Sequence, residues 1–296
     1  MGYGGANDQA VLEAVAQRGR GGTHFGRLAR LAPMHRSIWL WWALVACLAS
    51  ASARAESSLE IAVPASFGVM DAVALDTSGK RVGSARLEIE KLDNGEVRVF
   101  SHVALDGGAQ TTAQAILAPI NGGRNLRILR QESRSIDPDY NSLGVLSIDH
   151  SGRVATCSGT DKDRESVRAL DLPESDRVVN VPYNLLFSPL VDGSAETMDF
   201  QIFVCRPRPY LVSFRAGVER REPTSASEPG LVEISFEPQG GLISFIARRF
   251  APELVFWFEP KRANPWIAHR FPLYSSGPDV VVVREGVSYG RLMNGR

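Results

Sequence analysis

This sequence has no excess of charge of either sign, and it contains few lysines, cysteines and histidines. The 33 basic residues equal the 33 acidic ones, and only four of the basic residues are lysines. This balance gives no support to nucleic-acid binding, which normally shows as an excess of Lys and Arg. The hydrophobic fraction of 44% excludes wholesale disorder, so we expect a folded globular protein and no nucleic-acid partner.

The signature motifs of common catalytic and cofactor sites are also missing. The sequence contains no G-x-S-x-G, no H-E-x-x-H and no Walker A loop. His102, His150 and His269 have no second histidine two or four residues away, which is the spacing of many metal sites. We therefore expect no metal and no cofactor, and we assign no catalytic residue.

The longest apolar run is short and lies near the amino terminus. It covers about 12 residues, Ile38 to Ala49, whereas a helix needs about 20 to cross a bilayer. A short basic start from Met34 precedes the run, and the small residues Ala53-Arg54-Ala55 follow it. This order predicts a secretory signal peptide over residues 34–55, cleavage between Ala55 and Glu56, and export to the periplasm.

Two alternatives at this end stay open. The stretch Leu44 to Cys47 resembles a bacterial lipobox, and lipidation of Cys47 would produce an outer-membrane lipoprotein. Lipidation is the one route to membrane association that we expect. Residues 1–33 precede the signal peptide, and we interpret them either as an over-long gene prediction, with Met34 as the true start, or as a disordered leader.

The expected exported chain, residues 56–296, differs from the whole in charge and in cysteine content. Removing residues 1–55 takes away six arginines and two acidic residues, which leaves 27 basic and 31 acidic residues and a net charge of −4. Cys157 and Cys205 are the two cysteines that remain. In an oxidising compartment such a pair is expected to form a disulfide, which would stabilise the fold by about 2–4 kcal/mol.

Polar and apolar residues alternate with a period of two over most of this region. The clearest case is Arg86 to Val99, where Asp93-Asn94-Gly95 predicts the turn of an antiparallel hairpin. A second hairpin is predicted from Leu143 to Thr156. The other predicted strands cover residues 59–63, 69–75, 110–118, 126–132, 199–205, 210–219, 231–237, 254–258 and 280–284. We predict one β-rich domain over residues 56–296.

Helical patterns are few. Pro182 to Leu190 fits one short turn that Pro189 should end, and apolar spacing from Leu242 to Phe250 predicts a short amphipathic helix. The fold class is therefore mainly β: one large curved antiparallel sheet, or a partly closed barrel, with one or two short helices.

Aromatic residues gather between Phe250 and Pro272, where two Trp and four Phe occur. Aromatic side chains in this density often line a groove for apolar ligands, although a packed core strand would have the same composition. Under the ligand interpretation, the residues that we expect to line the site are Phe245, Trp257, Phe258 and Trp266. An alternative is an envelope enzyme that acts on glycan or peptide, with Asp137, Asp139 and a histidine brought together by the fold.

The carboxyl-terminal half resembles a family of exported bacterial β proteins of unknown function. The likeness rests on Pro252, on the strand Leu254 to Phe258, on a last strand from Val280 to Glu285, and on the glycine-bearing segment Val82-Gly83-Ser84. That family is in turn similar to the half-barrels of lipoprotein carriers, which can hold acyl chains. The resemblance implies a non-enzymatic periplasmic protein whose partner is a lipid, another apolar small molecule or an envelope protein; a structural adaptor without a pocket is the remaining alternative.

Overall fold

Antiparallel β-strands dominate the computed structural model, which describes residues 59–138, 142–161, 164–174, 177–205, 208–224, 229–239, 254–274 and 277–294. All of them belong to one compact unit. The strands are β1 (Ile61–Ala62), β2 (Gly68–Leu75), β3 (Arg81–Lys91), β4 (Val97–Leu105), β5 (Gln110–Ile120), β6 (Asn125–Asp137), β7 (Ser142–Asp149), β8 (Val154–Asp161), β9 (Arg164–Asp171), β10 (Thr197–Val204), β11 (Tyr210–Glu222), β12 (Leu231–Pro238), β13 (Val255–Phe258), β14 (Trp266–Pro272) and β15 (Asp279–Arg284). The helices are short: α3 (Tyr183–Leu186), α4 (Ser188–Asp192), α6 (Tyr289–Met293) and the 3-10 turn η1 (Asn121–Gly123).

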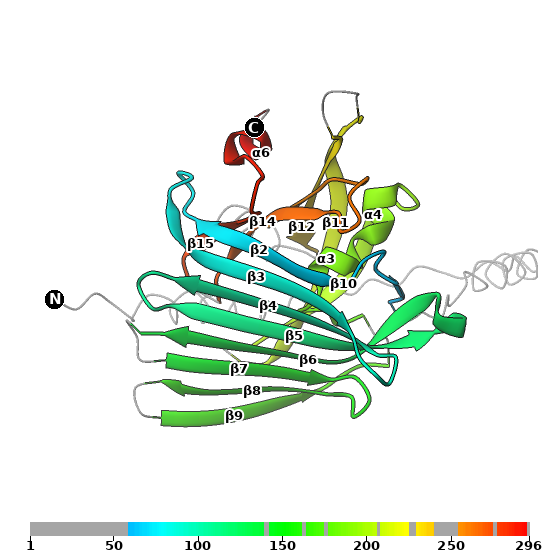
Figure 1. Ribbon diagram of the computed structural model, residues 1–296. Helices are drawn as coiled ribbons and strands as arrows, with labels where there is room; N and C mark the ends of the chain where they lie inside the picture. Colours follow the sequence, from blue (N-terminus) through cyan, green and yellow to red (C-terminus); the bar gives the residue numbers. More distant parts are fainter. Residues whose placement is uncertain are drawn as a thin grey trace, which may run out of the picture. The chain divides into compact units, whose positions relative to one another are not determined.

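A single curved sheet contains all of these strands, and it does not close into a barrel. Its order is β10-β11-β12-β13-β14-β15-β2-β3-β4-β5-β6-β7-β8-β9, with β1 paired to β6 beside this path. In Figure 1, β2 to β9 form a curved layer, and α3 and α4 lie behind it beside β10 to β12. The predicted fold class is confirmed. None of the described helices is both long and apolar enough to cross a membrane.

Both predicted hairpins are present. Strands β3 and β4 pair from Gly83–Leu105 to Lys91–Val97, and Gly95 takes a φ of 85° in the turn between them, which few other residues adopt. Strands β7 and β8 pair in the same way, and the Asp149 carboxylate accepts hydrogen bonds from the N–H groups of Ser151 and Gly152. In both cases a short polar turn determines the register of the strands.

Three local expectations were wrong or incomplete. Pro189 does not end the helical segment; it lies in the first turn of α4, where a missing N–H removes no helical hydrogen bond. The residues around His269, where no strand was predicted, form strand β14. Strand β9 was not predicted at all. The predicted helix from Leu242 to Phe250 lies outside the described residues.

The two ends of the open sheet are fastened to each other. Cys157 in β8 and Cys205, just after β10, form a disulfide with their Cα atoms 5.8 Å apart, as predicted. Beside it, the segment that follows β9 forms a parallel bridge with β10 between Val178 and Gln201. Ile148, Ala155, Leu172 and Phe203 pack around this junction in a buried cluster. The sheet is therefore held close to a barrel although its edge strands are not directly paired.

The concave face of the sheet, called the inner face below, packs against α3 and α4. Tyr183 of α3 lies among phenylalanine rings from four strands and from the junction of α3 and α4, with ring centroids between 5.5 and 6.1 Å away. Burial raises the pKa of its hydroxyl above the usual value, so Tyr183 is neutral. The rings in contact with it are Phe187, Phe200, Phe236, Phe256 and Phe271.

The opposite, outer face of β12 to β15 is covered by the carboxyl-terminal helix α6. Leu292 of α6 is fully buried against Trp257 and its neighbours. The Trp257 indole N–H donates to the Glu233 carboxylate at 3.1 Å, and Arg220 forms an ion pair with the same carboxylate at 3.0 Å. Strand β13 is thus buried on both faces, by α3 on one side and by α6 on the other, which explains its uniformly apolar sequence.

Candidate functional site

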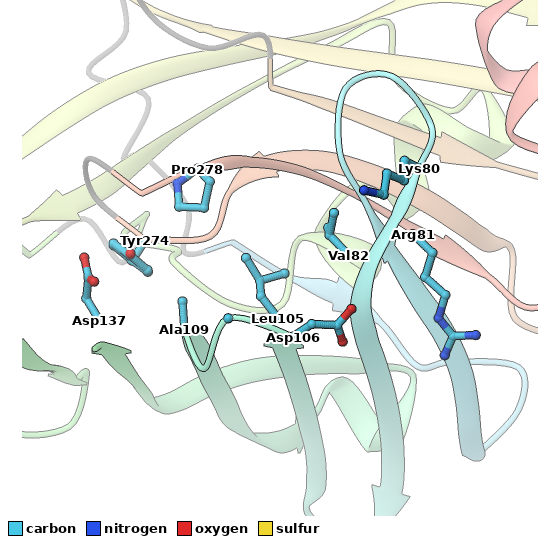
Figure 2. Close-up of a pocket in the computed structure, with 10 residues that line it drawn as sticks. Lys80, Arg81, Val82, Leu105, Asp106, Ala109, Asp137, Tyr274 and Pro278 are labelled. Atoms are coloured by element: carbon cyan, nitrogen blue, oxygen red, sulfur yellow. The ribbon is translucent and has the colours of Figure 1, made fainter. Parts of the chain in front are cut away.

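A cavity of about 600 Å³ opens at one end of the curved sheet, and this end is called the mouth below. Three connections meet there: the β2–β3 turn, the β4–β5 turn and the β14–β15 loop (Figure 2). The volume falls within the range of about 300–1,000 Å³ that is typical of small-molecule sites. The lining residues are Lys80, Arg81, Val82, Leu105, Asp106, Gly107, Ala109, Asp137, Tyr274 and Pro278.

The β2–β3 turn, which carries Lys80 and Arg81, is held rigid by Asp76. The Asp76 carboxylate accepts hydrogen bonds from the Ser78 hydroxyl at 2.6 Å and from the N–H groups of Ser78 and Lys80 at 2.9 and 3.0 Å. These bonds, above all the one from the Ser78 hydroxyl, hold the pKa of Asp76 below its usual value. Gly79 has a φ of 86°, and the Tyr289 ring of α6 lies where its Cβ would be. The turn is therefore held by its internal hydrogen bonds to Asp76 and by the Tyr289 ring that packs against it.

The β4–β5 turn lies next to it and is equally ordered. Asp106 donates its N–H to the Val82 carbonyl of the neighbouring strand at 2.8 Å, and Gly108 donates to Leu105 at 2.9 Å. Gly108 has a φ of 89°, and a Cβ there would only just contact Pro138. The two turns are thus linked by a backbone hydrogen bond, which makes one continuous wall of the mouth.

The β14–β15 loop reaches across the inner face toward β5. The Thr111 hydroxyl of β5 donates to the Leu273 carbonyl at 2.8 Å, although four strand pairings separate β15 from β5 in the sheet. Within the loop, Leu273 and Gly277 donate backbone hydrogen bonds to Pro278 and Tyr274, and the Tyr274 ring packs over Gly277. The loop therefore places Tyr274 at the rim of the cavity, between Pro278 and Asp137 in Figure 2.

Four charged side chains line the mouth, and their formal charges cancel. Lys80 and Arg81 are exposed on the β2–β3 turn, and Asp106 is exposed on the next turn. Asp137, at the end of β6, is only 7% exposed. A carboxylate this buried is normally stabilised by partner groups, and Asp137 has such a partner.

Small side chains continue inward from the mouth along the inner face. Thr111 and Ser135 come two residues after Ala109 and two before Asp137, and they pair across β5 and β6. The next row along the same face runs from Leu87 of the core to Ser101, Ala113 and Ser133. Apart from the buried Leu87, these residues are half-buried, unlike the fully buried Val99 and Ala115 further in. The inner face of β4 to β6 thus carries a strip of small, half-buried side chains beside the cavity, called the small-residue strip below.

The aromatic residues expected to line a ligand site lie away from the mouth. Phe258 and Trp266 are buried together in the inner core, and Trp257 is buried on the outer face under α6. Phe245 lies outside the described residues. The structure therefore brings two of the four together and places Trp257 on the other side of the sheet, because neighbouring residues of a strand point to opposite faces.

The groups of the alternative enzymatic interpretation are not assembled at the mouth. Asp137 lines the cavity, but none of the three described histidines is among the lining residues, and Asp139 lies outside the described residues. His150, in the β7–β8 turn, lies near Gln131 of β6. His102 of β4 lies near Gln110 of β5. His269 stacks on Phe256 in the inner core, where burial lowers its pKa to about 4.

The described residues contain no group of three or more His, Cys, Asp or Glu side chains that could hold a metal ion. Ala55, Glu56 and Cys47 lie outside these residues, so signal cleavage and lipidation stay predictions. The sequence identified Asp137 as chemically interesting, but it contained no sign that Lys80, Asp106 and Tyr274 would join it. Each of the three belongs to a turn that looks ordinary by itself.

Comparison with known proteins leaves the function open. No family model and no curated protein matches the chain. One similar solved structure is a β-barrel-like protein of domain of unknown function DUF1849 from Brucella abortus, with 8% sequence identity and a TM-score of 0.42. That match covers 75% of this chain and 97% of the other.

Proposed function

We propose that this protein is an exported, non-enzymatic binding protein of the bacterial cell envelope that holds an amphiphilic, lipid-like ligand. The observation that carries the proposal is the cavity of about 600 Å³ at the mouth, which lies next to the small-residue strip on the inner face. The ligand's apolar part would lie along Thr111, Ala113 and Ser133, and its polar part would remain at the mouth. Export is supported by the signal-peptide pattern of residues 34–55 and by the disulfide, which is typical of oxidising compartments.

The mouth suits a ligand with one polar end. Val82, Leu105 and Pro278 supply apolar contacts on the cavity wall, and four of the ten lining residues are charged. The charged groups would hold the polar end of the ligand at the mouth. Because the turns that carry these residues are hydrogen-bonded internally, little conformational entropy would be lost on binding.

The test begins with the full chain, expressed with its own leader in a Gram-negative host and purified from the periplasmic fraction. Mass spectrometry of the purified protein should give an amino terminus at Glu56. Organic extraction should release a co-purifying lipid, and an environment-sensitive apolar dye should bind the delipidated protein. Absence of both lipid and dye binding would overturn the ligand-binding proposal.

A matched pair of variants locates the binding site. Ser133→Leu places a large side chain in the small-residue strip on the inner face, and we expect it to weaken dye binding about fivefold or more. Ser147→Leu makes the same change on the outer face of β7, where Ser147 pairs with Glu132, and should leave binding unchanged. Equal effects of the two variants would mean that the dye does not occupy the inner face.

A further inference from the structure

The outer face of the sheet carries a second, smaller depression, of about 250 Å³, over strands β4, β5 and β6. Phe100, Gln114 and Glu132 lie opposite one another in one row across these strands. Thr112 and Arg134 pair in the next row. Directly paired residues point to the same face, so these five side chains stand on the outer face, away from the inner core. The lining residues are Phe100, Thr112, Ala113, Gln114, Glu132 and Arg134.

Phe100 supplies the apolar part of this outer depression. Its side chain is half-buried, so part of the ring is exposed, and its neighbours on the outer face of β4, Arg98 and His102, are polar. Thr112 and Ala113 beside it are small and leave space above the strands. The face of an aromatic ring carries partial negative charge and therefore attracts weakly positive C–H groups.

Three planar polar groups adjoin the ring: the Gln114 amide, the Glu132 carboxylate and the Arg134 guanidinium. Together they supply both donors and acceptors. In the described part of the chain, none of the three side chains forms a hydrogen bond or an ion pair within the protein. Arg98, by contrast, forms an ion pair with Glu88 at 3.2 Å. The hydrogen-bonding groups around Phe100 are therefore available to a ligand.

The charges at the outer depression are balanced. In the three rows of outer-face residues that cross it on β3 to β7, four arginines face four carboxylates, and His102 is the remaining titratable side chain. The eight charged residues are Arg86, Arg98, Arg130 and Arg134, with Glu88, Glu90, Glu132 and Asp149. A ligand that carries net charge of either sign gains little here, so the lining favours a neutral polar ligand.

From this combination we infer that the outer depression binds a neutral sugar ring of a glycan chain. A pyranose ring has a face of C–H groups that can stack on Phe100, and its hydroxyl groups both donate and accept hydrogen bonds, which matches Gln114, Glu132 and Arg134. The volume suits a single ring, because drug-sized ligands occupy about 300–1,000 Å³. The site lies on the other face of the sheet from the lipid-like ligand proposed above and does not depend on it.

The inference can be tested by calorimetric titration of the protein, purified from the periplasmic fraction, with cellotriose, β-1,4-mannotriose and triacetylchitotriose. One or more of these neutral trisaccharides should bind about tenfold more tightly than sorbitol, an acyclic polyol that has hydroxyl groups but no ring face. Raising the salt concentration from about 0.05 M to about 0.5 M should change the affinity by less than about twofold, because the ligand is uncharged. A large loss of affinity in salt would contradict a neutral ligand.

Substitutions around the outer depression should identify the site. Phe100→Ala should weaken binding of the trisaccharide about tenfold, whereas Phe100→Tyr keeps the ring and should stay within about twofold. Gln114→Leu should weaken binding about fivefold, and a change at this outer-face position should leave the fold intact. Tyr210→Ala removes an exposed aromatic ring of β11 outside the depression and is the matched control, with no expected change.

Ser133→Leu separates the two faces of the sheet. Ser133 follows Glu132 in β6 and points to the inner face, so its substitution should weaken dye binding and leave sugar binding unchanged, while Phe100→Ala should do the reverse. If no trisaccharide binds, or if Ser133→Leu abolishes sugar binding, the inference is overturned while the proposed lipid binding stands. Should Phe100→Ala not fold, Gln114→Leu decides, because an unchanged affinity in that variant would also refute the site.

Discussion

The side-chain oxygen of Gln131 in β6 accepts a hydrogen bond from the backbone N–H of Asn180 at 2.6 Å. The same oxygen accepts a second bond from Val181 at 2.8 Å, and the amide nitrogen donates to the Val178 carbonyl at 2.9 Å. Gln131 is 1% exposed. One buried side chain thus holds the segment that leads into α3, and α3 fills the interior of the sheet.

Replacing Gln131 with Leu should lower the free energy of unfolding by about 2–4 kcal/mol. Two buried N–H groups would lose their acceptor, and each buried group without a partner costs about 1–3 kcal/mol. Urea denaturation followed by tryptophan fluorescence measures the change. Gln114→Leu on the outer face of β5 is the control, with an expected change within about 0.5 kcal/mol. Equal losses in both variants would mean that Gln131 does not have this special role.

The disulfide between Cys157 and Cys205 should contribute about 2–4 kcal/mol to stability, because it closes a long loop and connects opposite ends of the sheet. Reductant should therefore lower the urea midpoint of the wild-type protein. The Cys157→Ser/Cys205→Ser double variant should start from the lower midpoint and should not respond to reductant. A thiol titration that found two free cysteines in the unreduced, denatured protein would contradict the bond.

His269 should make stability depend on pH. Its pKa is about 4 in the folded protein and about 6.5 in the unfolded chain, so between these values only the unfolded state binds a proton. This contribution to stability is complete above about pH 7 and is lost progressively as the pH falls toward 4.

Between pH 7 and pH 5 the wild-type protein should lose on the order of 1–2 kcal/mol more stability than a His269→Phe variant. Phe retains the stacking on Phe256 and cannot be protonated. Urea denaturation at both pH values gives the comparison. His102→Gln, on the outer face of β4, should keep the wild-type pH dependence; identical pH slopes in wild type and His269→Phe would exclude the mechanism.

Arg220 should be the main attachment of α6 to the sheet. Its guanidinium donates to the Leu292 carbonyl at 3.1 Å and to that of Asn294, and it pairs with the buried Glu233. Arg220→Gln removes this ion pair from the buried carboxylate, so a loss of about 3 kcal/mol or more and faster hydrogen exchange over residues 287–294 are expected.

Arg215→Gln is the control for this attachment. Arg215 forms an exposed ion pair with Asp199 at 2.7 Å, and exposed pairs contribute only about 0–1 kcal/mol. Unchanged hydrogen exchange of α6 in Arg220→Gln would show that its other contacts, among them the packing of Leu292 and the ion pair between Arg291 and Glu259, are enough to fasten the helix.

The strand pattern could be predicted from the sequence wherever one face is buried and the other exposed, as in β3 and β4. The prediction of strands failed where this contrast is absent. In β9, Val167 is 76% exposed and no apolar side stands out, so the sequence shows no alternation. In β14, a register shift opposite Trp257 and Phe258 leaves Trp266, Ile267 and Ala268 all buried, and this breaks the period of two.

The mouth could not be predicted, because its lining comes from connections far apart in the chain. Asp106 and Tyr274 line the same cavity only because β15 pairs with β2, a relation that no local pattern encodes. Gly107 and Gly108 lie in the β4–β5 turn, but the sequence does not say what surrounds that turn. The site arises from strand order, and strand order is decided by packing of the whole sheet.

The pairing of β15 with β2 also has a kinetic consequence. Strands β2 to β9 form one meander and β10 to β15 another. The two meanders join only when β2 pairs with β15, which lies more than 200 residues later in the chain. Closing so long a loop is slow, so the mouth should be among the last parts to form, once the whole chain is available for folding. A chain cut between β9 and β10 would keep both meanders intact, and their reassembly from two fragments would report directly on this final step.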